Sequence, residues 1–151
     1  VREGARWASA AGLSVHVTLM FGYPWETHAE ALRTAELGRE LLRLGHAETL
    51  QATWLVPYPG TPLFRELQAT GGLLTEDWAA YDMRSPVMRC PLTEAEIRGL
   101  VSHAYRGFLQ PRVLLRRALG ALRHPMASAP FLLRGAAALA GHLRDFAGPR
   151  N

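Results

Sequence analysis

Two stretches of the chain alternate apolar and polar residues with a period of two, the pattern of a β-strand with one buried face. Residues 13–21 put Leu, Val and Phe side chains on one face and His16 and Thr18 on the other. Residues 50–56 repeat the alternation, with Thr53 on the mixed face. A wholly apolar face opposite a mixed one is typical of a barrel strand, in which the apolar side meets outer helices and the mixed side faces the lumen.

The rest of the chain has helical spacing, with capping signals that define its helices. Thr27 and Glu30 have the spacing of a capping box, in which each side chain bonds the backbone amide of the other residue. Gly45 has the place of a residue that ends this helix. The predicted helices span residues 1–11, 27–44, 61–70, 93–110 and 112–123, and a further apolar segment covers residues 131–143.

The order strand, helix, strand between residues 13 and 56 predicts a βαβ unit with a right-handed crossover and parallel strands. Parallel strands end at the same edge of a sheet, where α/β proteins carry their ligand-binding loops. The loops that follow these strands are residues 22–27 and 56–61. We therefore expect the two loops to be neighbours and to form part of one site.

Glu26, in the first loop, has two interpretations that the sequence leaves open. Its carboxylate favours the positive end of the following helix, and it could equally bind a cationic ligand group such as an amine. Tyr23 and Trp25 offer ring surface on which a flat ligand could stack. Gly22 permits a ligand to approach the backbone closely, whereas Gly60 is more simply explained by a turn.

Other candidate chemistry is limited. His16 faces the expected lumen, but a lone strand histidine is more often a hydrogen-bonded core residue than a ligand. Cys90 is the only cysteine and is interpreted as a small, partly buried side chain. The histidines lack metal-ligand spacing, and phosphate-loop, dinucleotide and serine-hydrolase motifs are absent. No metal site and no catalytic residue are predicted.

The charge is concentrated at one end of the chain. All 17 basic residues are Arg; residues 1–110 have a balance of −2 and residues 111–151 a balance of +6. We place a boundary at Pro111, which separates residues 1–110 from a basic helical extension over residues 111–151. A solvated subdomain is the first interpretation of this extension, and a contact with an anionic membrane surface is the second. Nucleic-acid binding is disfavoured because the Arg residues are not interleaved with aromatic ones.

Several motifs in residues 1–110 suggest a family. They are Ala11-Gly12-Leu13, the stretch from Met20 to Thr27, the stretch from Pro57 to Leu63, Asp77-Trp78 and Tyr81-Asp82. With them the chain resembles the carboxyl-terminal half of a radical S-adenosylmethionine enzyme of the kind with an upstream cobalamin-binding domain. The nearest group is that of the anaerobic magnesium-protoporphyrin monomethyl ester cyclase and related tetrapyrrole- or lipid-modifying enzymes.

The resemblance implies an α/β fold: the carboxyl-terminal part of a partial (β/α) TIM-like barrel with parallel strands, followed by an all-helical extension. It also implies that the strand-end loops line the top of the barrel near S-adenosylmethionine. The residues given to the cofactor pocket are Gly22, Tyr23, Glu26 and Pro57. The candidates for the substrate pocket are His16, Thr18, Thr53 and Tyr58.

The chain departs from this family in lacking its CxxxCxxC cluster motif and any cobalamin-binding stretch. We therefore expect a piece of a longer protein, inactive without an upstream half that is its partner. The full-length protein would hold S-adenosylmethionine and a [4Fe–4S] cluster, with cobalamin left open, and this part alone would hold none of them. Its substrate would be a small molecule, either a tetrapyrrole or a lipid. The alternative hypothesis is a non-catalytic α/β binding or scaffold module with a basic membrane-surface tail.

The absence of disulfides suits a reducing compartment. The expected location is therefore the cytoplasm, with membrane association through the C-terminal helices as the accompanying expectation.

Overall fold

The computed structural model describes residues 1–123 and 141. The expected apolar segment at residues 131–143 lies outside these residues, apart from residue 141. The helices and strands are α1 (Arg2–Ala10), β1 (His16–Phe21), α2 (His28–Leu44), β2 (Thr49–Trp54), α3 (Pro62–Thr70), α4 (Glu94–Tyr105) and α5 (Pro111–Arg123). Short 3-10 helices are η1 (Trp78–Ala80) and η2 (Arg106–Leu109).

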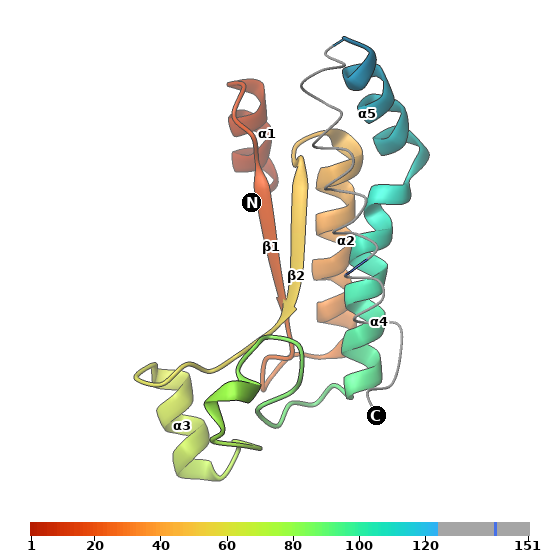
Figure 1. Ribbon diagram of the computed structural model, residues 1–151. Helices are drawn as coiled ribbons and strands as arrows, with labels where there is room; N and C mark the ends of the chain where they lie inside the picture. Colours follow the sequence, from red (N-terminus) through yellow and green to blue (C-terminus); the bar gives the residue numbers. More distant parts are fainter. Residues whose placement is uncertain (124–140, 142–151) are drawn as a thin grey trace.

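Strands β1 and β2 lie side by side and run parallel, in a register from His16 opposite Thr49 to Phe21 opposite Trp54. The predicted βαβ unit is therefore confirmed, and the chain has a mixed α/β architecture (Figure 1). The first strand begins at His16 and not at residue 13 as predicted. Strand β2 begins opposite His16, at Thr49, so Leu13 has no strand residue to pair with, and its side chain is 64% exposed. The described residues form a sheet of two strands, and no barrel is formed among them.

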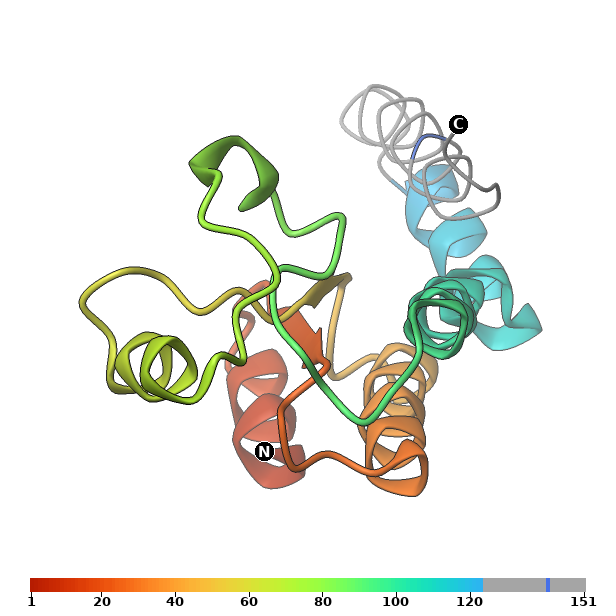
Figure 2. The same cartoon turned by 90° about the horizontal axis from the view of Figure 1, so that it is seen from below.

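Helices α2 and α4 cover one face of the sheet, and the main core lies between them and the strands (Figure 2). Phe21 on β1, Leu41 on α2 and Ile97 on α4 are fully buried there. Gly38 lets α2 approach the sheet closely, since a Cβ at this position would lie 2.6 Å from Leu50 Cδ1. Leu32 and Leu44, also on α2, are exposed and take no part in this core.

Two capping boxes are present among the described residues, one of them the box predicted at Thr27 and Glu30. The Thr27 hydroxyl accepts the Glu30 amide, and the Glu30 carboxylate accepts the Thr27 amide at 2.9 Å. Thr93 and Glu96 make the same reciprocal pair at the start of α4. Each threonine hydroxyl also donates to the carboxylate of its partner glutamate at 2.7 Å. The hydroxyl and amide hydrogen bonds that each carboxylate accepts favour its ionised form, so they lower the pKa of both Glu30 and Glu96.

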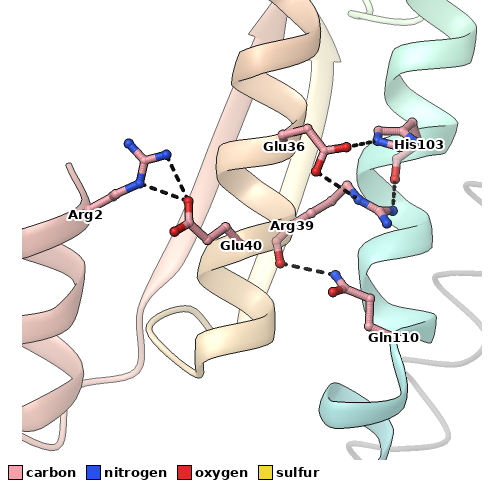
Figure 3. A network of polar contacts seen from close by, with 6 residues as sticks. All are labelled: Arg2, Glu36, Arg39, Glu40, His103 and Gln110. Carbon is pink, nitrogen blue, oxygen red and sulfur yellow. Dashed lines mark hydrogen bonds and ion pairs between the residues drawn. The ribbon is translucent and has the colours of Figure 1, made fainter.

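A polar network joins α2 to α4 and to the segment that follows α4 (Figure 3). The Arg39 guanidinium donates to the backbone carbonyl of His103 at 2.8 Å, and the Gln110 amide donates to the carbonyl of Arg39 at 3.2 Å. Glu36 contacts the imidazole of His103 and lies 3.6 Å from Arg39 Nε, a distance for an ion pair but not for a hydrogen bond. These contacts fix α4 against α2 and hence against the sheet.

The two edges of the sheet differ. Backbone amides of β2 alternate in direction, and those of Ala52 and Trp54 point away from β1. The Ala52 amide donates to the Tyr105 hydroxyl at 3.2 Å, and the Trp54 amide donates to the Met83 carbonyl at 3.4 Å. On the outer edge of β1, no described residue supplies such a partner to His16, Thr18 or Met20.

Helix α5 packs on the carboxyl end of α2. Val113 is fully buried and belongs to the main core. The Arg116 guanidinium donates to the carbonyl of Leu42 at 2.6 Å, and Arg117 donates to the carbonyl of Glu48 at 2.8 Å. These contacts tie the first turns of α5 to the α/β unit, while the division of the chain at Pro111 stays a prediction.

Candidate functional site

The candidate site is the pair of loops that leave β1 and β2 at the same end of the sheet. The Leu55 amide donates to the Phe21 carbonyl at 2.8 Å, so the strands are still paired where the loops begin. Helix α3 and the segment 73–91 lie at this end, whereas α1 and α5 lie at the opposite end (Figure 1). The neighbouring exits expected from the βαβ unit are therefore present.

The first loop is closed by a hydrogen bond between its two ends. The Gly22 amide donates to Glu26 Oε2 at 2.8 Å, and the Glu26 amide donates to the Tyr23 carbonyl at 3.0 Å. Glu26 is 8% exposed, which is low for a carboxylate. Its position is thus set by the loop backbone, while the cap of α2 is supplied by Thr27. No other polar partner of the Glu26 carboxylate is found in the described part of the chain.

Gly22 has a positive φ of 94° and is buried, with three side chains around it. A Cβ at Gly22 would lie 3.0 Å from Ile97 Cδ1 and 3.7 Å from Cys90 Sγ. A methyl group would therefore be both strained in the backbone and crowded by α4. In the structure, glycine at this position serves the packing of the loop beneath α4 as well as its turn.

Two aromatic side chains project from the first loop. The rings of Tyr23 and Trp25 have centroids 5.5 Å apart and an interplanar angle of 39°. Trp25 is 68% exposed, so it does not pack against the helices that cover the sheet. The loop thus combines a buried carboxylate with a solvent-facing indole.

In the second loop, neighbouring Pro57 and Tyr58 differ in burial. Pro57 is fully buried, whereas Tyr58 is 44% exposed. The Thr61 hydroxyl donates to the Tyr58 carbonyl at 2.7 Å and accepts the Phe64 amide at 3.2 Å, which joins the turn to the cap of α3. Gly60 has a φ of 86° with open space around it, as a plain turn requires.

The remaining pocket candidates are spread along the face of the sheet opposite α2 and α4. Thr53 is buried and lies one residue before the end of β2. Thr18 is exposed in the middle of β1. His16 is exposed at the first residue of β1, where its ring bonds the Thr49 hydroxyl at 2.8 Å. Phe21 lies five positions after His16 along the strand, about 17 Å at ~3.3 Å per residue, so His16 does not lie with the loops.

The segment 73–91 closes over the strand exits through contacts of Met83 and Cys90 that sequence reasoning did not predict. The Met83 carbonyl accepts the Trp54 amide there, and Cys90 lies next to Gly22. Burial raises the pKa of the Cys90 thiol, which donates to the Leu92 carbonyl at 3.1 Å. No periodic pattern marks this segment, so nothing in the sequence indicated these contacts.

Trp78 and Tyr81 anchor this segment unequally. Tyr81 is buried with Val56 and Val87, whereas Trp78 is more than half exposed. The Trp78 ring lies 6.0 Å from that of Phe64 on α3 and 5.1 Å from that of Tyr81. Trp78 therefore joins the segment to α3 and not to the sheet.

One curated protein provides a comparison. Over 116 residues the chain is 32% identical to an uncharacterized methyltransferase of Pyrococcus horikoshii, a match that covers 76% of this chain and 24% of the relative. The chain thus spans about a quarter of the length of that relative. No protein-family profile matches the chain. No solved structure matches it either.

This comparison corrects the assignment made from the motifs. The relative is named a methyltransferase, and it gives no support to a cobalamin-binding radical enzyme of the magnesium-protoporphyrin cyclase group. The expected [4Fe–4S] cluster and cobalamin are likewise unsupported, and the described residues include no group of three His, Cys, Asp or Glu side chains placed to hold a metal ion. The radical-enzyme function is therefore corrected, and the scaffold alternative gains nothing. The motifs misled because strand-exit loops rich in Gly and Pro occur on many unrelated α/β proteins.

None of the helices within residues 1–123 combines the length and the apolar character that crossing a bilayer requires.

Proposed function

We propose that this chain is part of an S-adenosylmethionine-dependent methyltransferase and that its two strand-exit loops contribute to the cofactor pocket. The observation that carries the proposal is the buried carboxylate of Glu26, fixed by the Gly22 amide at the carboxyl edge of a parallel sheet. The methyltransferase relative supplies the reaction class. The cofactor itself supplies the chemistry, an electrophilic methyl group on a sulfonium sulfur.

The chain's own residues would bind and orient the cofactor. Glu26 would accept the cationic amino group through the oxygen that Gly22 does not occupy, because a charge-assisted hydrogen bond is strong at a buried site. Tyr23 and Trp25 would stack on the adenine ring. Gly22 and Pro57 would form the floor of the cofactor pocket, because Gly22 has no side chain and Pro57 is fully buried.

We place the methyl acceptor, a small molecule, on the uncovered side of the strand exits. Tyr58 and Thr53 lie at this end, and Thr18 lies further back along β1. His16 stays a candidate for the far end of an extended acceptor, because it lies at the opposite end of the same face.

We further propose that β1 and β2 belong to a larger parallel sheet of the barrel type. The outer edge of β2 is already occupied by Tyr105 and Met83, whereas the outer edge of β1 is not. An additional strand would therefore join at β1, supplied by the polypeptide that makes up the rest of a protein as long as the relative. Helix α1, which leads into β1, would be the crossover from that strand.

The cofactor proposal is tested by equilibrium dialysis of radiolabelled S-adenosylmethionine with the full-length protein. Glu26→Gln keeps an oxygen for the Gly22 amide but removes the charge, so we expect affinity to fall about tenfold or more, the factor that corresponds to a charged hydrogen bond. The matched control is Glu66→Gln on α3, an exposed carboxylate. Equal affinity of wild type and Glu26→Gln, or an equal loss in the control, would contradict the assignment.

A further inference from the structure

Helix α5 carries an apolar face that the rest of the described structure leaves uncovered. Its members are Leu114, Leu115, Leu119 and Leu122, with exposed fractions of 50%, 61%, 48% and 77%. At helical spacing Leu115, Leu119 and Leu122 form one stripe, with Leu114 at its side. We call these four residues the leucine face of α5.

The opposite side of the same helix is fixed to the body of the protein. Val113 is buried in the core, and Arg116 and Arg117 bond backbone carbonyls near the end of α2. The guanidinium of Arg117 also lies 5.1 Å from the centre of the Phe108 ring. The direction of the leucine face is therefore set by packing, because rotation of α5 would break these contacts.

Charge indicates which surface the leucine face fits. Helix α5 contains no acidic residue, and exposed Arg112 lies one turn before Leu115. The sequence from residue 111 to residue 151 has a net charge of +6. An apolar stripe flanked by Arg, on a helix without acidic residues, is the pattern of a helix that lies in the interface of an anionic bilayer. A nucleic acid fits less well, because Arg116 and Arg117 already donate to backbone carbonyls of the protein.

We propose that the leucine face of α5 inserts into the surface of an anionic lipid bilayer. The leucines enter the boundary between headgroups and acyl chains, and Arg112 contacts the anionic headgroups. The strand-exit loops lie at the other end of the molecule (Figure 1), so they remain open to water when α5 is bound. This docking does not depend on methyl transfer.

The test is co-sedimentation of the intact protein with vesicles of phosphatidylcholine, alone and mixed with phosphatidylglycerol. We expect binding to the mixed vesicles that weakens at high salt. The triple variant Leu115→Ser, Leu119→Ser, Leu122→Ser should bind at least about tenfold more weakly. Arg112→Gln should bind about fivefold more weakly, the effect of one basic residue at a membrane surface.

Matched controls alter the same residue types elsewhere on the surface. Leu74→Ser and Arg6→Gln, both at exposed positions, should bind as wild type does. Circular dichroism of each variant establishes that it is folded. Absence of binding by folded wild type, or binding that the α5 variants do not change, would overturn the proposal. A dimer that the triple variant dissociates in sedimentation-velocity runs, without vesicle binding, would assign the face to a second copy of the chain.

Discussion

The Tyr105 hydroxyl on α4 lies 3.2 Å from the Ala52 amide on β2 and accepts its hydrogen bond. A side chain from a helix thus takes the place that a neighbouring strand would have on this edge of the sheet. Tyr105 is almost fully buried, so water cannot replace it as the acceptor. Strand β2 is therefore an edge strand on which the outward-pointing Ala52 amide still has a hydrogen-bond acceptor.

Replacing Tyr105 by Phe should therefore destabilise the protein although the ring is kept. The Ala52 amide would be left buried without an acceptor, which costs about 1–3 kcal/mol. Chemical denaturation, followed by circular dichroism, measures this difference in the free energy of unfolding. Tyr23→Phe, on the partly exposed loop, is the control and should change stability by less than about 0.5 kcal/mol.

The same residue predicts a response to alkaline pH. Burial raises the pKa of Tyr105 above its usual 10.0, so the folded protein favours the neutral phenol. Its contribution to stability is complete below pH 10 and is lost as the pH rises through the raised pKa. Wild type should lose stability above pH 10 more steeply than Tyr105→Phe, in denaturation curves measured across that range. Parallel curves would show that this phenol does not ionise on unfolding.

Gly22 and Gly60 make a pair that separates backbone strain from crowding. Both have positive φ, but a Cβ meets Ile97 at Gly22 and open space at Gly60. Gly60→Ala should cost about 1–2 kcal/mol, the strain of a left-handed alanine. Gly22→Ala should cost more, about 2–4 kcal/mol, because α4 must also shift. Equal losses in thermal or chemical unfolding would show that Ile97 moves aside freely.

The two capping boxes predict how the protein responds to acid. Hydrogen bonds from Thr27 and Thr93 lower the pKa of Glu30 and Glu96 below 4.5. The stability that they contribute is complete above that value and is lost as the pH falls through the lowered pKa values. Glutamine preserves the capping geometry but does not titrate, so Glu30→Gln with Glu96→Gln should flatten the fall in stability below pH 5. Glu66→Gln is the control and should leave the slope unchanged.

The elements with local signals were predictable from the sequence. Thr27 and Gly45 define both ends of α2, and the alternation around Leu19 and Ala52 defines the paired strands. Each of these signals depends on residues that are neighbours along the chain or on one face of one element. That is why both ends of α2 and the faces of the strands were predicted. The length of β1, which depends on its partner strand, was not, and neither was the end of α4, which stops at Tyr105 before the 3-10 helix η2 and not at residue 110.

The contacts at the candidate site were predictable only in part. That the loops of Gly22 and Tyr58 are neighbours follows from the parallel strands. The bond between Gly22 and Glu26, and the approach of Cys90 and Met83 to the strand exits, depend on irregular backbone that has no sequence period. The family assignment failed for a related reason. Gly- and Pro-containing turns occur after strands in many unrelated proteins, so such turns do not identify the reaction.

The unequal edges of the sheet lead to the last prediction, on hydrogen exchange. Every second amide of β1 points away from β2. These are the amides of His16, Thr18 and Met20, and they have no partner among the described residues. If a strand joins there in the full-length protein, these amides should exchange slowly in it and rapidly in the isolated 151-residue chain. The Ala52 amide, bonded to Tyr105 in both, is the internal reference for the stability of the shared fold. Rapid exchange at Thr18 in the full-length protein, with Ala52 protected, would show that no strand adds at this edge and that the sheet ends at β1.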